Sequence, residues 1–229
     1  MVIRDRPTLP VAQSWDGEYA RGRYRDDAPV DFVHDILAAA SNKGARKGLY
    51  IGCGNGRNYV PLVDGGLDLL GLDISQRALD QLIERAPHRR DRLVWGDLDA
   101  LPAAERFDMV IGIQVFQHGN RSTAHRHIRT AQGRVSPGGL FAIRVNAAGT
   151  EIALRHQVIE RRLDGGFTVK YLEGPKAGLL IHFFAEPELA ALFVRHFESV
   201  LPLRLRTHER DTPPSSHWCQ WEAIWQRVG

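Results

Sequence analysis

A run of glycines directly after a short apolar segment constrains the fold of this chain more than any other sequence feature. Residues 48–51 (GLYI) are apolar. Gly52, Gly54 and Gly56 then occupy alternate positions. A buried strand that passes through such a loop into a helix is typical of parallel α/β folds, because glycine tolerates positive φ and lets a ligand approach the backbone. We therefore expect a ligand site at the end of this strand.

The segments after the glycine run alternate between strand-like and helix-like patterns. Further buried strands are predicted at residues 69–72, 93–95, 109–113 and 140–145. Residues 75–85 instead place apolar side chains at helical spacing. Continuous apolar strands that alternate with helices predict a Rossmann-like, mostly parallel α/β sheet with helices on both faces.

The C-terminal part of the chain breaks this alternation. Residues 204–209 and 218–226 predict two strands joined by a turn, so that a reversed C-terminal hairpin closes a seven-stranded sheet. Residues 146–186 contain one strand-like segment, 167–172, between glycine-rich turns. Because this segment follows the fifth strand, we expect an insertion that acts as a lid over the site.

Length and composition indicate a single domain over residues 1–229. Cys53 and Cys219 form neither a metal-binding pair nor a disulfide pattern, which favours the cytoplasm. The sequence has no apolar stretch of membrane-helix length and no signal-peptide pattern. A net charge of +3 without a basic tail argues against nucleic acid as a partner. Monomer and homodimer both remain open.

Two aspartates follow the next two predicted strands. Asp73 could accept hydrogen bonds from both ribose hydroxyls of a nucleoside. Asp97 could meet an adenine amino group one strand later. The GxGxG spacing differs from that of phosphate-binding loops and no lysine follows it, which favours a nucleoside without phosphates. Each aspartate could instead cap a helix.

Together these motifs resemble the class I S-adenosylmethionine-dependent methyltransferases. GLYIGCGNGRN is similar to the glycine motif of that family, LLGLDIS to its ribose-binding motif and GDLDALP to its adenine-binding motif. FDMVIGIQVFQH and VSPGGLFAIRV follow in the family order, so the resemblance covers roughly residues 13–227. It implies an enzyme whose cofactor is S-adenosyl-L-methionine and which methylates the O, N or S atom of a small-molecule acceptor.

The resemblance also implies which residues contact the cofactor. From the sheet and its loops these are Gly52, Cys53, Gly54, Asn55, Gly56, Asn58, Asp73, Ile74, Gly96, Asp97, Leu98, Gln114 and His118. The resemblance further implies that helices in residues 1–45 cover the cofactor and that Tyr19, Arg23 and Tyr24 contact its methionine carboxylate, although the N-terminal helix could simply pack on the domain. Cys53 is expected to be a small filler and not a nucleophile.

Histidines are the candidates for catalysis. His118 follows the fourth strand, near the expected position of the transferred methyl, where it could act as a general base or only order the loop. His182 and His217 are further candidates, with ordinary structural roles as the alternative. No metal is predicted, because aspartate or cysteine partners at ligand spacing are absent. His125 and His127 lie among arginines before residue 135, and we interpret that cluster as a solvated helix face.

Other functions are compatible with the same motifs. The enzyme could methylate RNA or protein, transfer a different alkyl group or cyclise S-adenosylmethionine itself. A sensor without catalysis could also use this fold. The acceptor pocket should be built from residues 146–184, the N-terminal helix and the loop 211–217.

Overall fold

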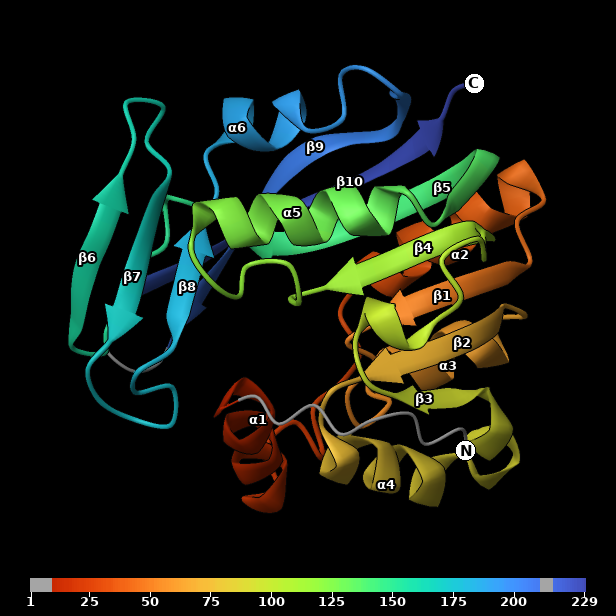
Figure 1. The fold of residues 1–229 in the computed structure, drawn as a ribbon, viewed down its shortest axis with the longest axis horizontal. Helices are drawn as coiled ribbons and strands as arrows, with labels where there is room; N and C mark the ends of the chain where they lie inside the picture. The colour runs from red at the N-terminus through yellow and green to blue at the C-terminus, as the bar shows by residue number, and fades with distance from the viewer. Residues whose placement is uncertain (1–9, 211–215) are drawn as a thin grey trace.

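The computed structural model describes residues 10–210 and 216–229, and Figure 1 shows the arrangement of their helices and strands. The α-helices are α1 (Pro10–Ala20), α2 (Phe32–Lys43), α3 (Tyr59–Asp64), α4 (Gln76–Arg85), α5 (Arg121–Gln132) and α6 (Glu186–Ala191), with 3₁₀ turns η1 (Pro87–Arg92) and η2 (Leu98–Ala100). The strands are β1 (Lys47–Ile51), β2 (Asp68–Asp73), β3 (Leu93–Trp95), β4 (Phe107–Ile113), β5 (Val135–Asn146), β6 (His156–Arg161), β7 (Phe167–Tyr171), β8 (Leu180–Phe183), β9 (Phe197–Arg210) and β10 (Ser216–Arg227).

A seven-stranded sheet in the order β3-β2-β1-β4-β5-β10-β9 forms the centre of the molecule. Strands β1 to β5 pair in parallel, whereas β10 runs antiparallel to both β5 and β9. The predicted Rossmann-like sheet with a reversed C-terminal hairpin is therefore confirmed. Residues 211–215, which belong to the loop that we expected at the acceptor pocket, lie outside the described part of the chain.

Helices cover both faces of this sheet, because neighbouring strand residues are buried on opposite sides. Tyr50 packs in the core with α2, α3 and α4, whereas Leu49 and Ile51 pack in the core with α5 and α6. Each such large apolar side chain contributes about 1.5–3 kcal/mol when fully buried. In the described ranges, no helix is long and apolar enough to cross a membrane.

The strand order changes direction at β1, which pairs with β2 on one side and β4 on the other. Chain segments that leave the carboxyl ends of β1 and β4 diverge there and open a crevice, the usual ligand site of such sheets. In Figure 1 the arrowheads of β1, β2 and β4 point toward the side on which α1 and the strands β6 to β8 lie. The predicted ligand site is thus at the edge that these elements face.

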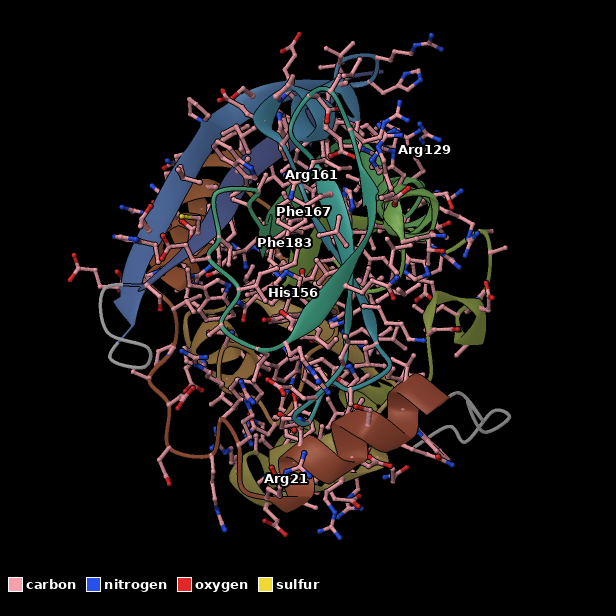
Figure 2. All side chains as sticks on the ribbon, turned by 90° about the vertical axis from the view of Figure 1, so that its left-hand side faces the viewer. Arg21, Arg129, His156, Arg161, Phe167 and Phe183 are labelled. Carbon is pink, nitrogen blue, oxygen red and sulfur yellow. The ribbon has the colours of Figure 1, made fainter. Side chains whose placement is uncertain are left out.

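The segment predicted as an insertion contains a second, three-stranded antiparallel sheet, β6-β7-β8. The sequence indicated only the middle strand, because β6 is almost entirely solvent-exposed and β8 is a short strand. Phe167 stacks on Phe183 with ring centroids 4.9 Å apart, and Arg161 lies over the Phe167 ring (Figure 2). This inserted sheet is attached to the loop after β4, since the backbone N–H of His182 donates to the carbonyl of Gln117 at 2.8 Å.

Candidate active site

A cavity of about 640 Å³ lies at the carboxyl ends of the parallel strands. We call it the large cavity. Most of the predicted cofactor contacts line it: Tyr19, Tyr24, Gly52, Cys53, Gly54, Asn55, Asn58, Asp73, Ile74, Gly96, Asp97, Leu98, Gln114 and His118. Gly56 and Arg23 do not. The structure therefore brings residues from four sequence motifs and the N-terminal segment together around one space.

The glycine loop allows other side chains to pack tightly at the cavity wall. Gly54 has a φ of 57°, and a Cβ atom at this position would lie 2.6 Å from the hydroxyl oxygen of Tyr19. A Cβ at Gly56 would lie 2.4 Å from a methyl of Leu82 in α4. Gly54 thus permits contact with the N-terminal helix, whereas Gly56 permits helix packing behind the cavity.

Asp73 is a buried carboxylate whose hydrogen-bond donors, within the described residues, are backbone N–H groups. Its Oδ2 accepts the N–H of Gly54 at 2.7 Å, and its Oδ1 accepts the N–H of Ser75 at 2.8 Å. Burial raises the pKa of Asp73 to about 6, although these backbone hydrogen bonds oppose the rise. Each oxygen retains a further lone pair. The site therefore fits a ligand with two neighbouring hydroxyl donors, as a ribose has.

The capping alternatives for the two aspartates have different outcomes. Ser75, and not Asp73, caps α4, because its hydroxyl accepts the N–H of Ala78 at 3.1 Å. Asp97 does cap η2 through the N–H of Asp99 at 3.0 Å, and it also lines the large cavity. Asp73 therefore caps no helix and lines the large cavity, whereas Asp97 does both.

The segment after α1 lines the large cavity through Tyr24, and two asparagines of the glycine loop hold this segment in place. Asn55 Nδ2 donates to the carbonyl of Tyr24 at 3.2 Å, and Asn58 Oδ1 accepts the N–H of Val30 at 3.0 Å. Tyr24 itself has a φ of 62°, an uncommon conformation for a bulky residue. Arg23 forms an ion pair with Glu18 at 2.8 Å and does not reach the large cavity.

A second cavity of about 220 Å³, the small cavity, adjoins the first. Both are lined by Trp15, Tyr24, Gln114 and His118. The other walls of the small cavity come from the N-terminal segment, residues 146–154, the inserted sheet and β10. The sequence predicted the N-terminal helix and residues 146–184 for an acceptor pocket, but it predicted neither Trp218 of β10 nor Gln117, which no motif distinguished from its neighbours.

His118 is the candidate base that the structure brings to the cavities. Its ring packs edge-on against Trp15, with centroids 5.2 Å apart. Burial and the charge of Lys176 lower the pKa of His118 to about 3. A neutral imidazole with so low a pKa is a weak proton acceptor at pH 7. Its position fits a role in catalysis, but its basicity favours the alternative that it orders the loop.

The other two candidate histidines line neither cavity. His217 lies 3.6 Å from a carboxylate oxygen of Glu151 on the outer end of β10. His182 is completely buried in β8, where its Nδ1 contacts Thr168 Oγ1 at 2.9 Å and its Nε2 contacts Glu188 Oε1 at 3.1 Å. Their positions support structural roles for both.

His182 belongs to a buried polar cluster that links the inserted sheet to α5 and α6. We call His125, His182, Glu188 and Arg121 the Glu188 cluster. His125 Nε2 lies 2.6 Å from Glu188 Oε1, and Arg121 Nε donates to the same oxygen at 2.6 Å. The interpretation of α5 as a solvated face is therefore wrong at His125, which is 7% exposed because it faces α6. Arg134, with the same exposure, is a further error of that interpretation.

The same cluster has the composition of a metal site. The ligand atoms of His125, His182 and Glu188 lie within 4.8 Å of one another. However, the Arg121 guanidinium already forms an ion pair with Glu188, and it places a positive charge where a cation would bind. We therefore assign no metal to this cluster.

Residues 49–139 match a sequence profile of the family described as methyltransferase domain. The match agrees with the fold and with the motifs that line the large cavity, and it supports the prediction of an enzyme of this family that uses S-adenosylmethionine. A search of curated proteins finds no match.

Solved structures that resemble this chain extend the similarity of fold to nearly its whole length. One is the 1,6-didemethyltoxoflavin-N1-methyltransferase of Burkholderia thailandensis, with a TM-score of 0.65 and 18% identity over 99% of this chain and 94% of that one. Another is the N-methyltransferase NodS of Bradyrhizobium japonicum, with a TM-score of 0.62 and 18% identity over 96% of this chain and 100% of that one. The glycopeptide N-methyltransferase MtfA has a TM-score of 0.56 and 17% identity over 92% and 99%. At these identities the likeness concerns the fold.

Proposed function

We propose that this chain transfers a methyl group to an O, N or S atom of a small molecule that binds in the small cavity. The observation that carries the proposal is that the small cavity adjoins the large one and shares four wall residues with it. A volume of about 220 Å³ is below the range of roughly 300–1,000 Å³ that holds drug-sized ligands, so a compact acceptor is favoured.

The roles of the residues follow from their positions. Asp73 would accept the ribose hydroxyls, and Asp97 with Leu98 would border the adenine. When bound, S-adenosylmethionine supplies a sulfonium methyl that a nucleophile attacks in line. The protein then has to align the acceptor and exclude water. Trp15 and His118 lie between the two cavities and are suited to that task.

The inserted sheet would form a lid over the acceptor site. Its strand β8 is hydrogen-bonded to the loop that carries Gln117 and His118. The hydroxyl of Ser14 in α1 also donates to the carbonyl of Pro175 between β7 and β8, at 3.3 Å. We therefore propose that this segment closes over the acceptor together with α1, and that the lid contributes to turnover more than to cofactor binding.

The names of the similar proteins support a nitrogen atom as one possible acceptor. The Burkholderia thailandensis and Bradyrhizobium japonicum proteins and MtfA are each described as N-methyltransferases. Two of these descriptions concern a small heterocycle and a glycopeptide. The dimensions of the small cavity favour the former size class for this chain.

Incubation of the enzyme with methyl-labelled S-adenosylmethionine and a metabolite extract tests the proposal. We expect a labelled small molecule and S-adenosylhomocysteine in equal amounts. Label that appears only in RNA or protein would contradict the small-molecule acceptor. A product formed without S-adenosylhomocysteine would contradict methyl transfer, and binding without turnover would indicate a sensor.

A further inference from the structure

The large and the small cavity meet at four residues. Trp15, Tyr24, Gln114 and His118 line both cavities, and we call these residues the junction. Tyr24 and Gln114 have φ angles of 62° and 59°, and within residues 10–210 and 216–229 no other residue except glycine has a positive φ. Such conformations are uncommon for bulky residues and concentrate at functional sites, where the surrounding contacts enforce them. The backbone of the junction is therefore held in a defined geometry.

Gln114 fixes the orientation of the His118 ring. Its N–H donates to the carbonyl of Arg144 at 2.7 Å, and its own carbonyl accepts Gln117 Nε2 at 2.8 Å. The His118 ring is hydrogen-bonded to the same carbonyl. Since a carbonyl oxygen can only accept, the ring nitrogen that faces it carries the proton. The other nitrogen of the neutral ring then offers a lone pair, and His118 is exposed enough to line both cavities.

All four side chains of the junction are uncharged at neutral pH. An indole and an amide, as in Trp15 and Gln114, do not ionise in this range. Burial raises the pKa of Tyr24, although the charge of Arg23 opposes the rise. Burial also lowers the pKa of His118 to about 3. The junction therefore suits an uncharged nucleophile that donates a hydrogen bond to the lone pair of His118.

This environment distinguishes between the three possible acceptor atoms. A hydroxyl has to lose its proton as it attacks, and the neutral junction groups are weak proton acceptors at pH 7. A thiol attacks as a thiolate, whose negative charge the lone pair of His118 would repel. An amine attacks as the uncharged base. Its lone pair forms the bond to the methyl carbon, the electron pair of the broken carbon–sulfur bond stays on sulfur, and the nitrogen keeps its proton as an ammonium until it is released into water.

We propose that the acceptor is an uncharged amine whose N–H donates to the free ring nitrogen of His118 at the junction. This hydrogen bond points the nitrogen lone pair toward the methyl group, and Gln114 is the positioning residue that fixes the His118 tautomer. The inference rests on the proposed function, because it assumes that the acceptor binds in the small cavity. It selects nitrogen among the three acceptor atoms and makes His118 a group that orients the acceptor.

The atom that receives the methyl group tests this proposal directly. The enzyme is incubated with S-adenosylmethionine that carries a carbon-13 methyl and with a metabolite extract, and NMR of the labelled product distinguishes N-methyl, O-methyl and S-methyl groups. We expect an N-methyl product. An O-methyl or S-methyl product would overturn the inference and leave the proposed function intact, whereas the absence of any labelled small molecule would contradict the proposed function itself.

The pH dependence of kcat/KM for the purified acceptor, at saturating S-adenosylmethionine and above pH 6.5, is a second test. The titratable or charged residues that line the small cavity are Arg23, Tyr24, His118, Tyr171 and Lys176. Because only the uncharged amine attacks, kcat/KM should fall about tenfold per pH unit below the acceptor's own pKa in solution. An acceptor that is uncharged throughout this range should give a flat profile. A fall centred at any other pH would assign the titration to the enzyme and overturn the proposal.

Variants of His118 test the hydrogen bond. His118→Phe keeps a flat ring without the lone pair and should lower kcat/KM about tenfold, with little change in S-adenosylhomocysteine affinity. His118→Asn, whose amide oxygen can accept the same hydrogen, should recover part of this loss. His34→Phe, an exposed change in α2, is the matched control and should alter neither quantity. Wild-type kcat/KM in His118→Phe, or a loss that only follows cofactor affinity, would overturn the role of His118.

Discussion

Two buried carboxylates in this protein have opposite electrostatic environments. Asp73 in the large cavity receives backbone N–H groups, and burial raises its pKa to about 6. Burial would also raise the pKa of Glu188, but hydrogen bonds from His125 and His182 and the charge of Arg121 hold it well below its usual range. One carboxylate is therefore incompletely stabilised, and the other is completely paired.

The hydrogen-bond pattern explains why the Glu188 cluster is complete. Thr168 Oγ1 donates to Glu160 at 2.7 Å, so its oxygen can only accept from Nδ1 of His182. The Nε2 of His182 then faces the two oxygens of Glu188 and has to donate as well. Within the described part of the chain, Asp73 has no such cationic partner. The comparison teaches that a ligand site leaves hydrogen-bonding capacity unused that a structural link uses.

The largest effect is expected when the paired carboxylate is removed. Glu188→Ala leaves the buried His182 without its anionic partner, and breaking a buried pair costs about 3–5 kcal/mol of unfolding free energy. Denaturant unfolding measures this loss. Glu186→Ala changes an exposed residue of the same helix and should cost far less. Equal stability of the two variants would show that the cluster does not hold the inserted sheet in place.

Removal of Asp73 should affect binding more than folding. Asp73→Ala is expected to weaken S-adenosylmethionine by at least the roughly 1.5–3 kcal/mol of a charged hydrogen bond. Calorimetry on the folded variant checks this, with Asp80→Ala on the exposed side of α4 as the control. An affinity equal to that of the wild type would exclude Asp73 from the cofactor site.

The raised pKa of Asp73 also predicts how affinity depends on pH. Ribose hydroxyls donate to the ionised carboxylate, so the cofactor competes with the proton that Asp73 takes up near pH 6. Affinity for S-adenosylhomocysteine should be constant from pH 6.5 to 7.5 and fall by up to about tenfold per pH unit below 6. Asp73→Asn should flatten this profile. A flat profile in the wild type would contradict the assignment.

A smaller effect is expected at His118, whose lowered pKa sets it apart from both carboxylates. If it orders the loop beside Trp15, His118→Asn should reduce turnover by about tenfold or less and leave the pH profile intact. If His118 is a general base, the variant should instead lose turnover by roughly 10²–10⁴-fold. The fall in turnover at low pH should then disappear from its pH profile. Turnover, cofactor affinity and melting temperature of one preparation separate these outcomes.

The contrast between the two carboxylates also marks the limit of what the sequence can predict. Asp73 follows a strand in a linear motif, so its place at the sheet edge follows from local pattern and parallel topology. Glu188 is contacted by His125, which is distant in the sequence and looks like part of a polar helix face. The side chain of His125 is buried only because α6 packs on α5 beside β8. Gln117 was missed because no motif marks it, although a hydrogen bond to the carbonyl of Gln114 fixes its side chain beside the small cavity.

The smallest effect, none at all, is expected from metal removal, and it tests whether the Glu188 cluster is as complete as its hydrogen bonds indicate. EDTA should change neither S-adenosylmethionine affinity nor melting temperature, and elemental analysis should find no stoichiometric metal. Arg121→Met sharpens the test, because it removes the guanidinium that occupies Glu188 and leaves the two imidazoles in place. This variant should gain Co²⁺ binding, visible as absorption bands of the bound ion, because two imidazoles and a carboxylate are a common ligand set. Tight Co²⁺ binding by the wild-type chain that His125→Gln abolishes would make this cluster a metal site and remove the contrast with Asp73.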